Sequence, residues 1–335
     1  MKKILSNYKL LSLFLTISLL YPFIVGQSSS MVYLGSLIFI YVIIVIGLNV
    51  LIGYGGQISI GHASFLAIGA YASAILTLKL GLPFLIALPL SGFITALIGF
   101  IVGMPAVKLS GHFLGVATLG FGVAIPEILL KWDALTGGFS GLFPERPSIF
   151  GFYFATDLQI YYLILAIGLI VTWLVHNLIE GRIGRAFVAI RESEIAATSV
   201  GINVPLYKTL MFSISAFYAG IAGSLYSHFI GFISPHDFNI NISFTVLAMV
   251  VIGGLGSKIG PFIGAIVLTL IPQFTDHVPG LSLVVTGAAL IIVILYLPEG
   301  LASIQTKIAN LKEKKVKQKE SGLVRITNEV ESESR

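Results

Sequence analysis

The sequence predicts an all-α, polytopic transmembrane protein of about 8–10 spans, some of them broken by glycine. Three features of the composition support this fold class. Apolar residues make up 56% of the 335 positions and charged residues only 10%, whereas soluble proteins carry about 25% charged residues. Between Leu10 and Leu130 the formally charged residues are Lys79, Lys108 and Glu127. The 36 glycines fit the close approach of helices in membranes.

Apolar runs of suitable length define ten candidate spans. The first run follows Lys2 and Lys3 and resembles a signal peptide, but the lack of a clear small-x-small cleavage pattern favours an uncleaved span. The eighth and ninth spans are short and broken by glycine, so they are either half-helices or one re-entrant element. The spans cover residues 10–26, 31–52, 63–80, 83–103, 113–130, 158–179, 209–231, 243–256, 260–276 and 281–298.

Basic residues orient these spans, since lysine and arginine concentrate in cytoplasmic loops. Ten spans place both termini and the loop 180–208 in the cytoplasm, and the loop 131–157 outside. Residues 1–301 then form the transmembrane domain. Residues 302–335 form a cytoplasmic tail, lysine-rich and then acidic, which we expect to be disordered near anionic lipid; a dedicated partner-binding role is the alternative. The orienting residues are Lys2, Lys3, Lys9, Arg182, Arg185, Arg191 and Lys208.

Two glycine-rich stretches interrupt the apolar runs, one over residues 53–65 and one over 253–264. Irregular backbone at membrane depth persists only where protein or a wet cavity satisfies it, and paired breaks in a transporter point to its pathway. The alternative is a pair of tight cytoplasmic turns, with small-residue helix packing in the second stretch and a structural role for the histidine. The pathway candidates are Gln57, Ser59, Gly61, His62, Ser64, Gly253, Gly254 and Gly256.

The sequence lacks the residues that several other functions would need. The chain has no cysteine, so disulfides and thiol chemistry are excluded. No P-loop pattern occurs, and the chain therefore cannot hydrolyse ATP itself. An ion-driven secondary transporter needs carboxylates on its pathway, but Glu127 is the one acid within a span, near its outer end and four residues from Lys131. The six histidines are scattered, which argues against a membrane enzyme or a metal site.

The loop 180–208 predicts two short amphipathic helices that end at Gly201. Apolar residues recur at loosely helical spacing, from Ile183 through Phe187 to Val200. An interfacial helix lying on lipid is the alternative. Acidic residues beside the basic ones make docking to a protein the better interpretation.

The segment from Glu194 through Ala196 and Ala197 to Gly201 resembles the EAA-type loop of ABC importer permeases. More widely, the chain resembles the branched-chain amino acid permeases of the LivM/LivH type. The matching segments are Arg185–Asn203, Gly53–Ala63, Trp132–Gly141 and Met249–Pro261, in the order of that family. The Trp-Asp-x-Leu-Thr-Gly-Gly pattern favours the LivM-like subunit. The Ile-x-Leu-Pro that ends the general loop motif is absent here, and Val204-Pro205 lies nearby instead.

The resemblance implies a permease subunit of an ATP-binding cassette importer for leucine, isoleucine and valine, in the cytoplasmic membrane of a prokaryote. It implies a second, LivH-like permease, two cytoplasmic ATPases that bind the ATP, and an extracytoplasmic solute-binding protein. We expect no cofactor in this chain, and lipid but no nucleic acid as a further partner. A permease for urea or short amides is the alternative. The implied ATPase-coupling residues are Arg191, Glu192, Glu194, Ala196, Ala197 and Gly201, and the external docking candidates are Trp132, Asp133, Thr136, Gly137 and Gly138.

Overall fold

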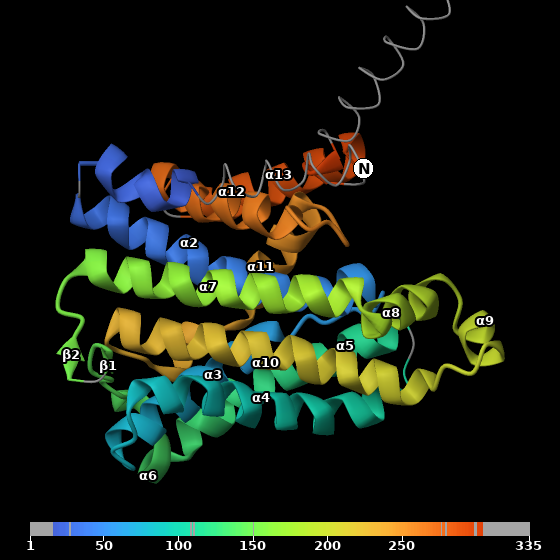
Figure 1. The fold of residues 1–335 in the computed structure, drawn as a ribbon, viewed down its shortest axis with the longest axis horizontal. Helices are drawn as coiled ribbons and strands as arrows, with labels where there is room; N and C mark the ends of the chain where they lie inside the picture. The colour runs from blue at the N-terminus through green and yellow to red at the C-terminus, as the bar shows by residue number, and fades with distance from the viewer. Residues whose placement is uncertain are drawn as a thin grey trace, which may run out of the picture.

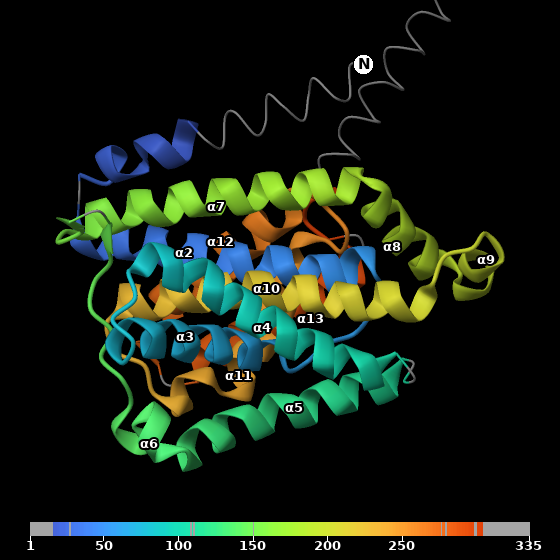
Figure 2. The same ribbon diagram turned by 60° about the horizontal axis from the view of Figure 1, so that its bottom comes forward.

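The computed structural model describes residues 16–26, 28–107, 109, 111–149, 151–275, 277–278, 280–297 and 300–303. These residues form a bundle of helices that mostly run along one common direction (Figures 1 and 2). A helix over 16–24 is followed by α2 (Ser29–Leu48), α3 (His62–Leu78), α4 (Phe84–Ala106), α5 (His112–Lys131), α7 (Asp157–Glu180), α10 (Val204–Ile230), α11 (Ile240–Gly253), α12 (Gly260–Thr275) and α13 (Leu281–Tyr296). The shorter elements are η1 (Asn49–Tyr54), α6 (Asp133–Thr136), η2 (Gly138–Ser140), β1 (Ser148–Ile149), β2 (Phe152–Tyr153), α8 (Arg182–Glu192), α9 (Glu194–Ser199) and η3 (Pro235–Phe238).

The predicted fold class is confirmed, because each predicted span coincides with one of these helices. Six helical segments of the described residues are long and apolar enough to cross a membrane, and α3, α12 and α13 are shorter apolar helices. The region 243–276 is not one continuous element. Helix α11 ends where Gly254 adopts a φ of +116°, which favours glycine, and α12 begins at Gly260 and packs against α11.

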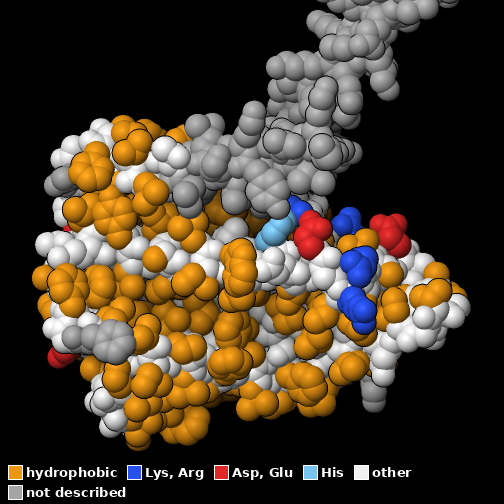
Figure 3. All heavy atoms as spheres, viewed as in Figure 1, with side chains coloured by type: hydrophobic (Ala, Val, Ile, Leu, Met, Phe, Trp, Pro, Cys, Tyr) orange, Lys and Arg blue, Asp and Glu red, His pale blue; other side chains and the backbone are white. Residues whose placement is uncertain are grey.

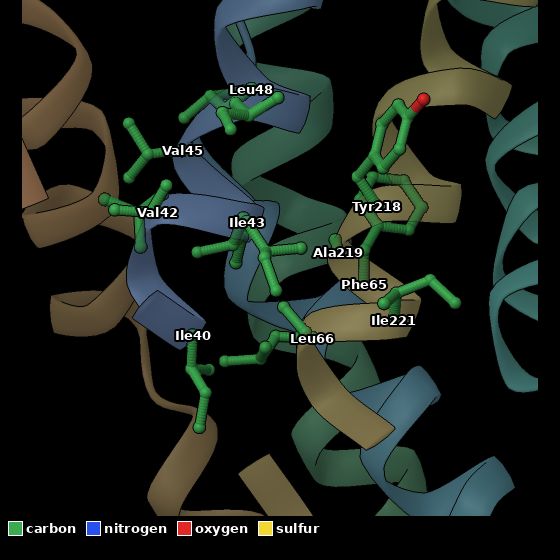
Figure 4. Packing of buried hydrophobic residues seen from close by; sticks show 14 of the residues in the cluster. Ile40, Val42, Ile43, Val45, Leu48, Phe65, Leu66, Tyr218, Ala219 and Ile221 are labelled. Atoms are coloured by element: carbon green, nitrogen blue, oxygen red, sulfur yellow. The ribbon is translucent and has the colours of Figure 1, made fainter. Parts of the chain in front are cut away.

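Helix α10 lies at the centre of the bundle, where it packs against α2, α3 and α4. Figure 4 shows the contact between Ile43 of α2, Leu66 of α3 and Ala219 of α10, all of which are buried. Glycines allow α3 and α10 to approach closely: a Cβ added at Gly69 would overlap the backbone of Gly220. Small residues at helix contacts let the backbones of membrane helices approach closely in this way.

The surface divides into an apolar band and two polar ends. Hydrophobic side chains cover most of the face in Figure 3, and charged side chains gather beside α8 at one end. All charged residues that the structure describes belong to the ends of the long helices or to the segments that join them. We name the two ends by what they carry: the α9 end, and the hairpin end with β1 and β2 (Figure 1).

Candidate functional site at the α9 end

The two glycine-rich stretches meet at a single side chain, Asn49. This residue opens η1, a π-helical turn that continues α2, and it is buried. Its Oδ1 accepts a hydrogen bond from the backbone N–H of Gly256 at 2.9 Å, and its Nδ2 donates to the carbonyl oxygen of Ser257, also at 2.9 Å. A Cβ at Gly53 would collide with the same Gly256 nitrogen. The breaks near residues 53 and 256 are therefore parts of one junction.

Arg191 joins the loop 180–208 to this junction. Its guanidinium donates from Nη1 to the carbonyl oxygen of Gly53. Its aliphatic part lies against Gly56, where φ is +67° and an added Cβ would approach the arginine Cγ to 3.0 Å. Gly256, with φ of +72°, lies so close that its Cβ would be 3.2 Å from Nη1. Gly56 and Gly256 need glycine because positive φ and close contact both disfavour a side chain, and Gly53 needs it because of close contact alone. We call Gly53, Gly56 and Gly256, together with Asn49 and Ser257, the glycine junction.

The loop itself folds into the two predicted helices, α8 and α9, and Gly201 follows them with φ of +84°. Helix α8 is amphipathic and buries Phe187 and Ile190 against the bundle. The apolar residues of α9 do not share that face: Ile195 is 83% exposed and Val200 is 75% exposed. Figure 1 shows α9 projecting beyond the other helices.

Helix α9 is nevertheless held in place. The Ser193 hydroxyl accepts from the Ala196 N–H at 3.2 Å and caps the helix. Ala197 is buried at its base, and Glu194 pairs with the nearly buried ammonium of Lys208 at 2.6 Å. The coupling residues predicted from sequence thus divide into three groups. Arg191 points into the junction, Ala197 and Glu194 anchor α9, and Glu192, Ala196 and Gly201 are exposed.

The polar segment 57–64 leads from the glycine junction into the bundle, and its predicted pathway residues Gln57, Ser59, His62 and Ser64 are all buried. Nε2 of His62 lies 3.2 Å from the Ser215 hydroxyl, which donates to the Gly47 carbonyl oxygen at 2.7 Å. Three atoms of the segment are buried without a partner in the described structure: Gln57 Oε1, Ser59 Oγ and His62 Nδ1.

Helix α5 closes this segment on one side. Gly61 lies against the backbone of Thr118 and Gly122, and a Cβ there would overlap it. The Ser64 hydroxyl donates to the Gly122 carbonyl oxygen at 3.1 Å, and the Ile60 N–H donates to the Thr118 hydroxyl at 3.0 Å. Glu127 lies farther along α5, where it is exposed and makes no ion pair with Lys131 in the described structure.

The external docking candidates lie at the hairpin end, and the 24-residue helix α7, about 36 Å long, runs from there towards the α9 end. Trp132 and Asp133 are exposed, whereas Thr136 is fully buried. Its hydroxyl donates to the Leu129 carbonyl oxygen at 2.6 Å and accepts from the Gly138 N–H at 3.2 Å. Gly137 and Gly138 adopt φ of +74° and +51°. The threonine and the two glycines therefore shape the loop.

Replacing Thr136 with valine should loosen this loop, because the change keeps the shape of the side chain and removes its hydrogen bonds. A buried backbone N–H left without a partner costs about 1–3 kcal/mol. We expect faster amide exchange over residues 133–142 and unchanged exchange in α10. The exposed Trp132→Ala variant is the control; equal exchange in the two variants would show that the threonine does not hold the loop.

Within the described residues, no three His, Cys, Asp or Glu side chains gather as a metal site. The arrangement offers a buried polar segment joined to a projecting helix. A family model described as "Branched-chain amino acid transport system / permease component" matches residues 30–294. The chain belongs to this permease family.

The relatives of this permease are likewise described as permease proteins. The high-affinity branched-chain amino acid transport system permease protein LivM of Salmonella typhimurium is 33% identical over 311 residues, which is 86% of this chain and 73% of the relative. LivM of Escherichia coli is 32% identical with the same coverage. The ribose import permease protein RbsC of Haemophilus influenzae is 26% identical over 68% of this chain and 71% of its own. No solved structure matches the permease significantly.

Sequence reasoning missed three residues that the structure brings into the site: Asn49, Lys208 as the partner of Glu194, and Ser215 as the partner of His62. Asn49 carried a readable signal, since it is an amide in the middle of an apolar run. A polar group in such a run is costly unless it has a partner. The other two partners are remote in sequence and carry no such signal.

Proposed function

We propose that this permease is one membrane subunit of an ATP-driven importer of branched-chain amino acids. The observation that carries the proposal is the bond from Arg191 to the Gly53 carbonyl oxygen, which links the last turn of α8, directly before the exposed helix α9, to the glycine junction. A permease without its own ATPase needs such a link between a docking surface and its pathway. The LivM relatives support the substrate class.

In this proposal α9 docks on a cytoplasmic ATPase through the exposed side chains of Ile195 and its C-cap residue Val200, together with Glu192 at the end of α8. The apolar residues supply buried area and the acid supplies polar contacts at the rim. A second, LivH-like permease, a second ATPase and an external solute-binding protein complete the importer. ATP binds to the ATPase subunits, and this chain contributes no cofactor site.

The α9 end then faces the cytoplasm. Of the eight Lys and Arg residues that the structure describes, five belong to this end and three to the hairpin end, which agrees with the positive-inside rule. The residues at the α9 end are Arg182, Arg185, Arg191, Lys208 and Lys258. The N-terminal lysines 2, 3 and 9 and nearly all of the tail 302–335 lie outside the described residues, and their cytoplasmic placement is part of this proposal.

Movement of α9 by the ATPase would be transmitted in two steps. Arg191 displaces the carbonyl of Gly53 and thereby the turn η1, and Asn49 carries the displacement to the backbone at Gly256 and Ser257. The glycines absorb the change in backbone angles at little cost. Opening of the junction exposes the polar segment 57–64, whose unpartnered atoms can then contact water or the passing solute. For this to occur, the ATPases must bind ATP more tightly when the junction is in one state, open or closed, than when it is in the other.

The test is uptake of labelled leucine and labelled urea by cells with and without this chain, before and after ATP depletion. We expect loss of leucine uptake alone when the chain is removed. Loss of urea uptake alone would retain the ATP-driven architecture and replace the substrate. Uptake that survives ATP depletion and collapses with the proton gradient would contradict the proposal.

A further inference from the structure

A cavity of about 660 Å³ opens at the hairpin end of the bundle, away from the glycine junction. It is lined by residues of α2, α11 and α12 and by the first residue of α7. Sites for small molecules usually measure about 300–1,000 Å³ and combine apolar walls with a few polar groups. The cavity has both the size and the kind of lining that such a site needs.

One charged residue lines the rim of the cavity, and it is paired with an arginine beside it. Asp157 lines it, and its Oδ2 accepts a hydrogen bond from the Ser29 hydroxyl at 2.6 Å. Its Oδ1 pairs with Nη2 of Arg146 at 2.9 Å. Carboxylate oxygens have further lone pairs, and a guanidinium carries five N–H donors, so this pair retains the capacity to bind another ion pair. An incoming ammonium therefore has a partner at the rim, and an incoming carboxylate has one in the arginine beside it.

Helix α12 adds polar groups farther into the cavity. The hydroxyl of Thr269 is buried and has no hydrogen-bond partner in the described structure. Pro272 lies inside the helix and has no N–H, so the carbonyl oxygen of Leu268 lacks its usual donor four residues later. Leu268, Thr269 and Pro272 all line the cavity. Unsatisfied polar groups are costly at membrane depth unless water or a ligand reaches them.

Part of the remaining lining is apolar: Leu34 and Leu37 of α2, Met249 of α11 and Leu268 of α12. The other lining residues carry polar groups and are Ser30, Tyr33, Tyr41, Thr245 and Gln273. The apolar part fits a branched aliphatic side chain. Urea has no apolar part and would leave these residues without a partner.

We propose that this cavity is the first binding site in the permease for a zwitterionic, branched aliphatic amino acid. Asp157 binds the ammonium, Arg146 binds the carboxylate, and the aliphatic side chain lies between Leu37 and Met249. The inference rests on the proposed function, which makes the hairpin end the side from which solute arrives.

The experiment measures weak binding directly, by saturation-transfer NMR of leucine on the assembled transporter in nanodiscs without solute-binding protein. We expect transfer to the leucine methyl groups, and weaker transfer to 4-methylpentanoate and isoamylamine, which lack the ammonium and the carboxylate respectively. Asp157→Asn should weaken binding about tenfold, the effect of losing one charged hydrogen bond. Leu37→Trp, which fills the cavity and leaves the ion pair intact, should abolish transfer.

Glu127→Gln is the matched control, because it also removes one acid at the hairpin end but lies on α5, outside the cavity. The inference is overturned if wild-type transporter shows no transfer to leucine, as it would if lipid or the second permease fills the cavity. It is also overturned if Asp157→Asn and Leu37→Trp bind leucine as well as Glu127→Gln does. Leucine uptake by the same wild-type transporter separates the two proposals. If leucine is taken up but these variants bind it as well as the control does, the cavity is not the site and the proposed function stands. If leucine is not taken up, the proposed function is wrong.

Discussion

Replacing Arg191 with leucine is expected to lower ATP-driven transport by roughly tenfold to a hundredfold while the ATPases still bind and hydrolyse ATP. The change removes the bond from the guanidinium to the Gly53 carbonyl oxygen and leaves the exposed face of α9 unaltered. A hydrogen bond from a charged donor is worth about 1.5–3 kcal/mol, and each 1.4 kcal/mol corresponds to about a factor of ten. Uptake and ATP hydrolysis, measured on the same reconstituted transporter, report the two activities.

Arg185→Leu is the control for this prediction. Arg185 lies on the same helix α8 and carries the same charge, but its Nη1 donates at 3.1 Å to the Glu180 carbonyl oxygen, within the same turn of chain. Arg191→Lys should restore part of the transport, because lysine keeps a donor but not the planar guanidinium. If Arg185→Leu and Arg191→Leu reduce transport equally, general loss of positive charge explains the effect and the link through Gly53 is wrong.

Two glycine-to-alanine changes are expected to alter stability in opposite directions. At Gly69 even a single methyl group would overlap the backbone of Gly220, so α3 and α10 must separate, at a cost of about 1–3 kcal/mol for overpacking. At Gly120 of α5 an added Cβ meets nothing within 4 Å. Alanine is about 1 kcal/mol more favourable than glycine inside a helix. Gly120→Ala should therefore unfold at a higher temperature than the wild type, and Gly69→Ala at a lower one.

Thermal unfolding of the two variants in one detergent gives this comparison directly. Both changes add the same group to a helical glycine, so helix propensity cancels and the difference reports packing alone. A rise in melting temperature for both variants would show that α3 and α10 have room between them, and would contradict the close packing at the centre of the bundle.

The fold was largely accessible from the sequence because the preference of a segment for lipid is a local property. Twenty apolar residues predict a membrane helix wherever they occur, so predicted and observed boundaries at α4 and α5 differ by at most three residues. The π-helical turn η1 was not accessible in this way. Its residues, Asn-Val-Leu-Ile-Gly-Tyr, continue the apolar run of α2 and carry no pattern that distinguishes one helix type from another.

The sequence predicted individual residues of the candidate site but not their contacts with one another. Glycine pairs and polar residues in apolar surroundings indicated Gln57 and Gly256, and the loop pattern indicated Arg191. That Arg191 bonds to Gly53, 138 positions away, depends on tertiary packing that no local pattern encodes. The same holds for Asp157 and Thr269, which belong to unremarkable helices and meet only around the cavity.

The turn η1 has a consequence for how members of this family diverge. Its Gly55 N–H bonds to the Val50 carbonyl oxygen at 3.1 Å, five residues back, so the turn holds one residue more than an α-helical turn. A homologue that lost this residue would continue in α-helical form, and every later position would be rotated by about 100°. The carbonyl at position 53 would then point away from Arg191. Single-codon deletions between 49 and 54 should accordingly be purged by selection, whereas those in the connection 81–83 should be tolerated.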